Sequence, residues 1–415
     1  MTTAVPSLAA AEALDQQDPL ASRRALFDLP ADVIYLDGNS LGALPKDVAA
    51  RTATVVSTEW GQSLIRGWNT HDWIGMPARV GDKIGQLIGA APGTVVCADS
   101  TSVNLFKVLA AALALRPDRR DIISQRDNFP TDLYMAQGLI SLTGGDRRLR
   151  LLDDANVIPA LSEDTAVLML TEVDYRTGAK LDMVAITQAA HDVGALVIWD
   201  LAHSAGAFPV DLTRAGADFA VGCGYKYLNG GPGAPAFLYV APAHQDDFAQ
   251  PLSGWMGHSS PFTFEPDYRP AVGIDRYLCG TPSVLAMSAL DVGVDIALEA
   301  DMGAIRAKSI ALCDFFITAV EQLAPGHGLQ LVSPRDGTLR GSQVSFAHSD
   351  GYPVMQALIA RGVIGDFRAP NILRFGFTPL YVGFTDTWRA AEALADILAT
   401  RAWDDPAFHA RKSVT

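Results

Sequence analysis

The residues best suited to chemistry lie in the glycine-rich stretch 221–233, which has Lys226 at its centre. Lys226 is the only lysine between Lys180 and Lys308, and it follows the apolar segment 218–223, which we expect to form a strand. A loop rich in glycine leaves a side chain uncovered, so this amine can reach a cleft. A partly desolvated lysine amine forms Schiff bases with carbonyl compounds, although an ordinary surface lysine on a turn is the alternative for this residue alone.

The position of Asp200 favours a Schiff-base role for Lys226 over that of an ordinary surface lysine. It ends the wholly apolar segment 195–199, which is typical of a buried parallel strand. A carboxylate at the C-terminal end of such a strand faces the crevice in which α/β proteins bind ligands. There it can pair with the ring nitrogen of pyridoxal phosphate and keep it protonated, whereas helix capping is the structural alternative. His203, three residues further on, can share the same ligand or support its neighbours.

Two other stretches are suited to the phosphate and the ring of such a cofactor. Thr101 and Ser102 stand where the expected strand 95–99 gives way to an apolar helix. Small hydroxyl residues at a helix N-terminus present backbone N–H groups to an anion, but they also occur as simple caps. Phe129 precedes a proline, which holds its backbone extended and can present the ring for stacking. A buried core phenylalanine is the alternative there.

Three further residues have side chains suited to a substrate. Arg374 lies in an otherwise apolar strand within the run 371–381, and a buried guanidinium needs an anionic partner such as the α-carboxylate of an amino acid. A structural Arg–Asp pair is equally compatible with that pattern. Ser40 lies in a turn, where it can touch a ligand or be an ordinary turn serine. Trp68 belongs to an aromatic loop that can line a pocket for a flat ligand or pack between domains.

Composition narrows the class of protein. A chain of 415 residues, 49% of them hydrophobic, is long enough for a large core and two domains. Its formal net charge of −14 disfavours nucleic acid and anionic membranes as partners. The sequence has no apolar run long enough for a membrane span, and its first residues lack the features of a secretory signal, so we expect a cytoplasmic protein. The four cysteines are scattered without Cys/His clustering, which argues against a zinc site and against a disulfide framework.

The order of expected elements predicts the architecture. Strands and helices alternate from about residue 90 to 240, which indicates a mixed or mainly parallel sheet covered on both faces. Strands become fewer after residue 283. We therefore expect residues 1–45 to form an N-terminal arm that contributes to the small domain and the active site, followed by a large cofactor-binding domain at 46–282 and a small C-terminal domain at 283–415.

In this order the residues resemble the fold-type I pyridoxal-phosphate enzymes across nearly the whole chain, and the kynureninase family in particular. The resemblance implies an α/β fold, with a mainly parallel seven-stranded sheet flanked by helices and a smaller α+β C-terminal domain. The motifs that carry it are GNSLG at 38–42, FPTD at 129–132, WDLAHSAG at 199–206, GYKYLNGGPG at 224–233, GW at 254–255 and LRFGFTPLY at 373–381.

The resemblance also implies roles for single residues. Lys226 would hold pyridoxal 5'-phosphate as a Schiff base, Asp200 would pair with the ring nitrogen, and Phe129 would stack on the ring. Arg374 would bind the substrate carboxylate, with Ser40 close to the substrate and Trp68 near its aryl pocket. The implied phosphate contacts come from Thr101, Ser102, Tyr225, Trp255 and Thr281, and Asp132, Thr171 and His203 complete the cofactor shell.

The family reaction is the hydrolysis of L-kynurenine to anthranilate and L-alanine in tryptophan catabolism. It would have Lys226 take the α-proton and Tyr225 protonate Cβ. Family members that prefer 3-hydroxykynurenine often carry His at the position of Trp68, so Trp favours plain kynurenine there. The family is homodimeric with sites at the subunit interface, which predicts a homodimer. Cysteine desulfurases and selenocysteine lyases are the alternative, but they usually carry His directly before the Schiff-base lysine, and they need a cysteine on a reactive loop.

Overall fold

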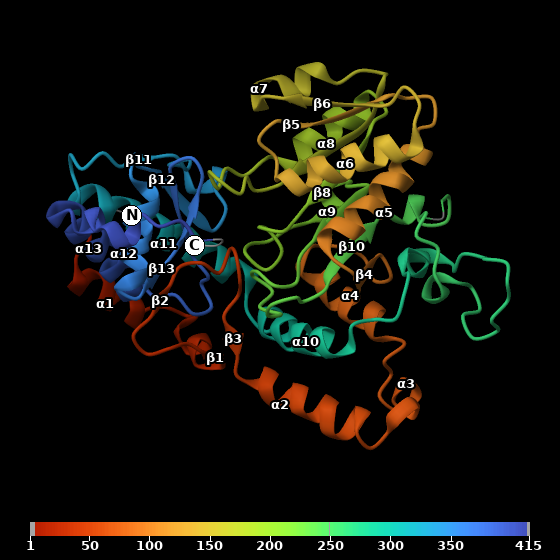
Figure 1. Cartoon of the computed structure of the whole chain (residues 1–415), viewed down its shortest axis with the longest axis horizontal. Helices are drawn as coiled ribbons and strands as arrows, with labels where there is room; N and C mark the ends of the chain where they lie inside the picture. Colours follow the sequence, from red (N-terminus) through yellow and green to blue (C-terminus); the bar gives the residue numbers. More distant parts are fainter. Residues whose placement is uncertain (1–4, 249, 413–415) are drawn as a thin grey trace. The chain divides into compact units, whose positions relative to one another are not determined.

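The computed structural model describes residues 5–248 and 250–412. The chain divides into two compact units, whose segments can be followed by colour in Figure 1. The first unit comprises Met1–Lys46, Val173–Lys180 and Glu299–Thr415, and the second comprises Asp47–Glu172 and Leu181–Leu298. Each unit is therefore assembled from segments that are distant in the sequence.

The second unit is built on a seven-stranded sheet in the order β4-β10-β9-β8-β7-β5-β6. Strands β9, β8, β7, β5 and β6 run parallel, while β10 pairs antiparallel with both β9 and β4. This confirms the expected α/β class with a mainly parallel sheet. Most of these strands are wholly buried, as expected for a sheet covered on both faces. Their bounds are β4 Val95–Ala98, β5 Asp121–Gln125, β6 Arg148–Leu152, β7 Thr165–Thr171, β8 Leu196–Asp200, β9 Phe219–Gly222 and β10 Ala236–Val240.

Helices cover this sheet through apolar faces. Helix α5 packs on β7, β9 and β10, and its Leu105 and Val108 are fully buried in a core that also contains Ile198 and Val221. Helix α4 packs on the edge strand β4, and α8 packs on β8. The helices of this unit are α2 Asp47–Thr54, α3 Gly67–Thr70, α4 Met76–Leu87, α5 Thr101–Ala114, α6 Pro130–Thr143, α7 Asp154–Val157, α8 Met183–Asp192, α9 Leu212–Ala215 and α10 Val284–Leu298.

Helix α10 extends the second unit beyond the boundary expected at residue 283. It packs against α4 and α2, and Lys83 on α4 binds Asp291 on α10 at 2.7 Å. It also lies directly on the loop that carries Lys226. A Cβ atom at Gly293 would stand 2.1 Å from the carbonyl oxygen of Leu228, so only glycine permits this approach. The change of unit therefore comes after α10 and not before it.

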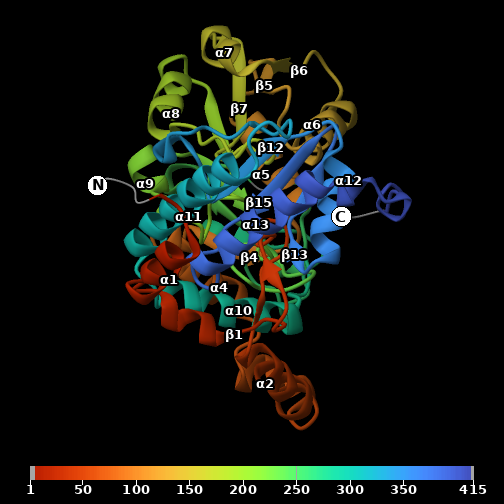
Figure 2. The ribbon, with the colours of Figure 1, turned by 90° about the vertical axis from the view of Figure 1, so that its left-hand side faces the viewer.

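The first unit has a four-stranded antiparallel sheet in the order β11-β12-β15-β14 and two small two-stranded pairings, β13 with β2 and β1 with β3. Helix α11 packs along α13 and also contacts β12, and all three elements are labelled in Figure 2. The strands are β1 Phe27–Asp28, β2 Ile34–Tyr35, β3 Leu44–Pro45, β11 Gln330–Leu331, β12 Gln343–Ala347, β13 Val363–Ile364, β14 Asp366–Arg368 and β15 Ile372–Gly376, and the helices are α1 Leu8–Gln16, α11 Met302–Leu323, α12 Gly351–Ala360 and α13 Phe384–Thr400.

The N-terminal arm is fixed to the C-terminal helices by polar contacts. Asp15 accepts hydrogen bonds from the backbone N–H groups of Phe384 and Thr385 at 2.6 and 2.9 Å, and so caps the N-terminus of α13. The buried amine of Lys308 on α11 binds the carboxylate of Asp18 at 2.7 Å. No helix in the described ranges is long and apolar enough to cross a membrane.

Candidate active site

The loop after β9 leaves the side chain of Lys226, the predicted reactive amine, partly exposed. Of residues 221–230, only Tyr225 and Lys226 are partly exposed, and the rest are buried. The loop is closed by a backbone hydrogen bond from Asn229 to the carbonyl of Lys226 at 2.9 Å, with Asn229 in a left-handed conformation. A second hydrogen bond of 2.9 Å, from the backbone N–H of Gly230 to the carbonyl of Gly224, joins the two ends of the segment that contains this turn. The hydrogen-bonded loop therefore presents one amine and one phenol.

Asp200 stands on the neighbouring strand, as expected. It ends β8, pairs in parallel register with Val221 of β9, and is buried. Its Oδ1 accepts a hydrogen bond from the backbone of Ala202 at 2.7 Å. Burial raises the pKa of the Asp200 carboxyl, and the positive charge of Lys226 acts against that rise. A buried acid and an amine thus interact at the C-terminal ends of two adjacent parallel strands, where ligands of α/β proteins bind.

Asp132 adds a second buried carboxyl to Asp200. It lies in the first turn of α6, and its Oδ2 is buried without a hydrogen-bond partner among the described residues. Burial, followed by the charge of Asp200, raises the pKa of Asp132 well above its usual range. Two interacting buried carboxyl groups ionise at low cost only beside a cation. A protonated ring nitrogen supplies such a cation, so these residues fit pyridoxal phosphate.

Phe129 is presented to solvent and not to the core. Its side chain is 41% exposed at the N-cap position of α6, and the Lys226 amine lies 5.9 Å from its ring centroid. Asn128, which the sequence analysis did not single out, fixes this geometry. Its Oδ1 accepts from the backbone of Phe129 at 2.7 Å and from the hydroxyl of Thr171, while its Nδ2 donates to Ser124 at 3.1 Å. The core alternative for Phe129 is therefore wrong, because a large part of its side chain is exposed.

Thr101 and Ser102 are the first two residues of α5, and both are partly exposed. The capping side chain is that of Ser100, whose Oγ accepts from the backbone of Val103 at 3.4 Å. The predicted pair therefore does not serve as the cap. Its backbone N–H groups lie at the positive end of a 14-residue helix, as an anion site requires.

Aromatic rings form a connected cluster that contains both predicted tryptophans. Trp68 contacts Trp73 and Trp255 edge to face, with ring centroids 6.1 and 6.0 Å apart. Trp255 in turn contacts Phe262 at 5.7 Å. The indole of Trp73 is held by a 3.0 Å hydrogen bond to Glu59. The structure thus places the expected aryl-pocket residue against an expected phosphate-binding residue.

The other predicted cofactor residues differ in their surroundings. His203 and Thr171 are buried near Asp200, at the ends of the strands β8 and β7. Tyr225 is partly exposed, and burial raises its pKa above the usual range, so its hydroxyl keeps its proton at neutral pH. Thr281 is exposed in the segment before α10. The described chain therefore assembles the ring-binding residues and leaves Thr281 at the surface.

Arg374 and Ser40 lie together in the first unit. Arg374 is buried on β15 and donates to Ser40 Oγ at 2.7 Å and to the carbonyl of Tyr175 at 2.7 Å. Its Nε and Nη2 also bind the two carboxylate oxygens of Asp366, the first at 2.7 Å. The structural Arg–Asp pair, which the sequence left open, is thus present. Neither Asp366 nor Tyr175 was singled out from the sequence, because their approach to Arg374 depends on strand pairing and on the inserted segment 173–180.

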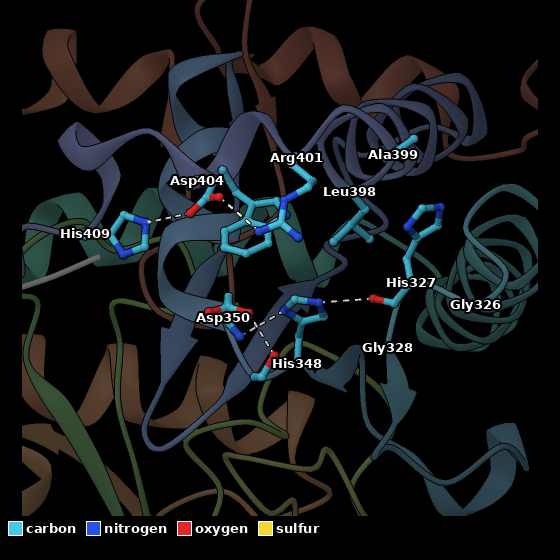
Figure 3. A pocket seen from close by; sticks show the side chains of 12 residues that line it. Gly326, His327, Gly328, His348, Asp350, Leu398, Ala399, Arg401, Asp404 and His409 are labelled. Atoms are coloured by element: carbon cyan, nitrogen blue, oxygen red, sulfur yellow. Dashed lines mark hydrogen bonds and ion pairs between the residues drawn. The ribbon is translucent and has the colours of Figure 1, made fainter.

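A separate polar pocket of about 660 Å³ lies in the first unit between the ends of α11 and α13 and the start of α12 (Figure 3). Its His348 donates to the carbonyl of His327 at 3.1 Å and accepts from the backbone of Asp350 at 3.0 Å. Arg401 binds Asp404 at 3.0 Å. Its polar side chains are largely engaged with one another, and its lining contains none of the predicted site residues.

Comparison with solved structures identifies the class of fold. The cysteine desulfurase of Thermococcus onnurineus NA1 matches 96% of this chain and 99% of its own, with a TM-score of 0.75 and 19% identity. The cysteine desulfurase CsdA of Escherichia coli matches 92% of this chain and 98% of its own, with a TM-score of 0.76 and 21% identity. The chain has the fold-type I architecture of pyridoxal-phosphate enzymes.

Sequence relatives then identify the family within that fold. The kynureninase of Burkholderia pseudomallei (strain 1106a) is 57% identical over 408 residues, which cover 97% of this chain and 98% of that protein. The kynureninase of Pseudomonas fluorescens is 53% identical over the same share of both chains. The kynureninase C-terminal domain model matches residues 305–394. This chain belongs to the kynureninase family.

Proposed function

We propose that this chain is a pyridoxal-phosphate-dependent hydrolase that cleaves L-kynurenine to anthranilate and L-alanine. The observation that carries the proposal is the interaction of Lys226 with the buried Asp200 on adjacent parallel strands, in a chain that is 57% identical to a kynureninase. When bound, pyridoxal phosphate supplies an electron sink for the carbanion at the α-carbon.

The residues that would hold the cofactor follow from their positions. Lys226 provides the amine for its covalent attachment, and Phe129 offers an exposed ring for stacking. Asp200 and Asp132 are buried together, and their carboxyl groups would keep the ring nitrogen of the cofactor protonated. Thr101 and Ser102 offer the N-terminus of α5 to the phosphate.

Two side chains of the same loop would move protons during the reaction. Lys226 Nζ removes the proton from the α-carbon of the substrate. Tyr225 Oη then protonates Cβ after water has attacked the γ-carbonyl and the Cβ–Cγ bond has broken. Because burial keeps the pKa of Tyr225 above its usual range, the hydroxyl carries the required proton at neutral pH.

The substrate groups have matching residues in the chain. Arg374, supported by Ser40, supplies a guanidinium for the α-carboxylate. Trp68, in contact with Trp255, offers an apolar face to the aniline ring. A tryptophan at this position favours kynurenine over 3-hydroxykynurenine, with the hydroxylated compound as a secondary substrate.

The experiment that tests this function begins with an absorbance scan of the purified protein. A Schiff-base band near ~420 nm that is lost in Lys226→Ala would support the attachment point. L-Kynurenine is then added while anthranilate fluorescence is followed. Release of sulfide from cysteine without anthranilate would instead favour the desulfurase alternative, and a protein that takes up no cofactor would overturn the proposal.

We also propose that the chain functions as a homodimer in the cytoplasm. Val56, Trp60, Leu64 and Ile65 are all exposed on consecutive turns of residues 55–66, which is costly for a monomer in water. A second copy of the chain, as in the family, would cover them. The four cysteines are free, as is usual in a reducing compartment. Light scattering that gives the mass of one chain at micromolar concentration would overturn the dimer.

A further inference from the structure

The guanidinium of Arg374 belongs to a cluster of four charged side chains, which we call the four-charge cluster: Asp37, Asp366, Arg368 and Arg374. Asp366 is in contact with both arginines, since Arg368 Nη2 lies 2.6 Å from its Oδ2. Asp37 joins the cluster through the backbone, because it bridges to Gly376 two residues after Arg374. Ser40 donates a hydrogen bond to Asp366 at 2.9 Å.

Asp366 remains ionised within this cluster. Burial acts to raise its pKa, but the charge of Arg374, the hydrogen bonds that Arg374 donates and the charge of Arg368 outweigh burial and lower it. Two guanidinium groups therefore face one permanent carboxylate. The net charge of the cluster is decided by Asp37, and it is zero when Asp37 is ionised and positive when Asp37 is protonated.

The surroundings of Asp37 favour its neutral form. Its Oδ1 is buried and has no hydrogen-bond partner in the ranges the structure describes. Burial, followed by the charge of Asp366, raises the pKa of Asp37 to about 7, although the charge of Arg374, the hydroxyl of Ser40 and the charge of Arg368 act to lower it.

The other titratable groups beside Asp37 are the phenols of Tyr35 and Tyr381. Burial raises the pKa of each above its usual range, so both stay neutral at physiological pH. The described groups around Asp37 thus include no second acid that changes charge near neutrality, and Asp37 is the group that can adjust the charge of the cluster.

An anionic ligand at Arg374 changes this balance. A carboxylate that arrives beside a neutral, buried cluster leaves an excess negative charge, which is costly in a medium of low polarity. We propose that Asp37 takes up one proton when the α-carboxylate of the substrate binds at Arg374. The proton passes from solvent to a carboxylate oxygen of Asp37 and returns to solvent when the ligand leaves. The inference rests on the proposed function, because it takes the α-carboxylate as the ligand of Arg374.

The proposal predicts how binding depends on pH. Below pH 7 Asp37 already holds its proton, and the carboxylate binds without a further cost. Above about pH 7 each binding event must first protonate Asp37, so KM for L-kynurenine rises by up to about tenfold per pH unit. In Asp37→Asn the cluster carries its positive charge at every pH, and this rise disappears.

The direct test is proton uptake on binding, measured by calorimetry with the holoenzyme. L-Alanine is titrated at pH 8 in two buffers with different ionisation enthalpies, since it carries the same α-carboxylate and is not cleaved. Wild type is expected to take up about one proton more than Asp37→Asn. Asp396→Asn, which changes an exposed acid on α13 that pairs with Arg361, is the control and should match wild type.

Equal proton uptake by wild type and Asp37→Asn would overturn the proposal. If Asp37→Asn does not fold, the pH profile of wild type decides, because a KM that stays constant from pH 6 to pH 9 contradicts obligatory protonation. Failure of the proposed function is a different result. If the protein binds L-alanine with the expected proton uptake but releases no anthranilate from kynurenine, the proton uptake by Asp37 is supported and kynurenine is ruled out as the substrate.

Discussion

Asp366 binds Arg374 through two hydrogen bonds, from Nε to Oδ1 and from Nη2 to Oδ2, and both side chains are only 1% exposed. This pairing occupies one edge of the guanidinium and fixes the direction of the other. We expect Asp366→Asn to raise KM for L-kynurenine about 10- to 100-fold, with a smaller change in kcat, because the fork loses its fixed orientation. Steady-state kinetics check this, and an equal loss in kcat with unchanged KM would contradict it.

Tyr225 is expected to act late in the reaction. Tyr225→Phe removes the proton donor for Cβ but leaves the amine of Lys226, so anthranilate release should fall by about 10²- to 10⁴-fold. Exchange of the α-proton with deuterium in heavy water should continue. Mass spectrometry of recovered substrate measures the exchange, and Tyr239→Phe, which changes a buried tyrosine on β10, is the control. Equal loss of exchange and of anthranilate release would place Tyr225 in an earlier step.

Asp200 is expected to determine the electronic state of the cofactor. Asp200→Asn removes the carboxylate that would pair with the ring nitrogen, and we expect kcat to fall by at least about 100-fold while the Schiff-base absorption band remains. Absorbance and activity are measured on the same sample. A variant that keeps its band and its full activity would rule out the pairing of Asp200 with the ring.

Gly293 lets α10 approach the Lys226 loop closely. Gly293→Ala places a methyl group 2.1 Å from the carbonyl oxygen of Leu228, so the helix or the loop must shift. We expect a loss of about 1–3 kcal/mol in the free energy of unfolding and weaker cofactor binding. Gly138→Ala on α6 is the matched control, because its Cβ meets nothing within 4 Å, and it should stabilise the protein by up to about 1 kcal/mol. Chemical denaturation compares the two variants.

Asp218 makes the second unit sensitive to acid. It accepts hydrogen bonds at 2.8 Å each from His191, His244 and the backbone of Val197. Burial would raise its pKa, but the bonds from His244 and His191 outweigh burial and lower it. A lowered pKa in the folded state stabilises the fold above the unfolded pKa of about 3.9, and this contribution is lost as the pH falls through the folded value.

The matching measurement is the free energy of unfolding as a function of pH. Asp218→Asn should lower it by about 1–3 kcal/mol at pH 7, and the difference from wild type should shrink below about pH 4. A difference that stays constant down to pH 3 would mean that the charge of Asp218 does not contribute.

The sequence predicted those parts of the site that depend on local order along the chain. Lys226 and Asp200 lie at or just after strand ends and Phe129 precedes a proline, so their placement beside these strands follows from the strand and turn pattern. Asn128 and Asp366 were not predicted, because a polar residue one position before Phe129 or on a short strand has many possible partners. The contact of Asn128 with Thr171 forms only when segments distant in the sequence come together, and the contact of Asp366 with Arg374 depends on the register in which β14 pairs with β15.

The position of the domain boundary also depends on contacts that the sequence alone does not reveal. The long apolar helix α10 could not be assigned to a unit from its composition, since it is hydrophobic on most of its surface. Its assignment depends on contacts with α4 and α2 and on the absence of a side chain at Gly293, which permits close packing on Leu228.

The insertion of residues 173–180 into the first unit has a consequence for biosynthesis. Tyr175 belongs to the same unit as the strands β12 and β15, but it leaves the ribosome before these strands have been translated. The second unit can form its sheet once residue 240 has emerged, whereas the binding partner of Tyr175 arrives only with Arg374. The nascent chain must therefore carry the waiting segment 173–180 for more than a hundred codons. A fragment that ends at residue 298 would contain the second unit in full, but only the segments Met1–Lys46 and Val173–Lys180 of the first.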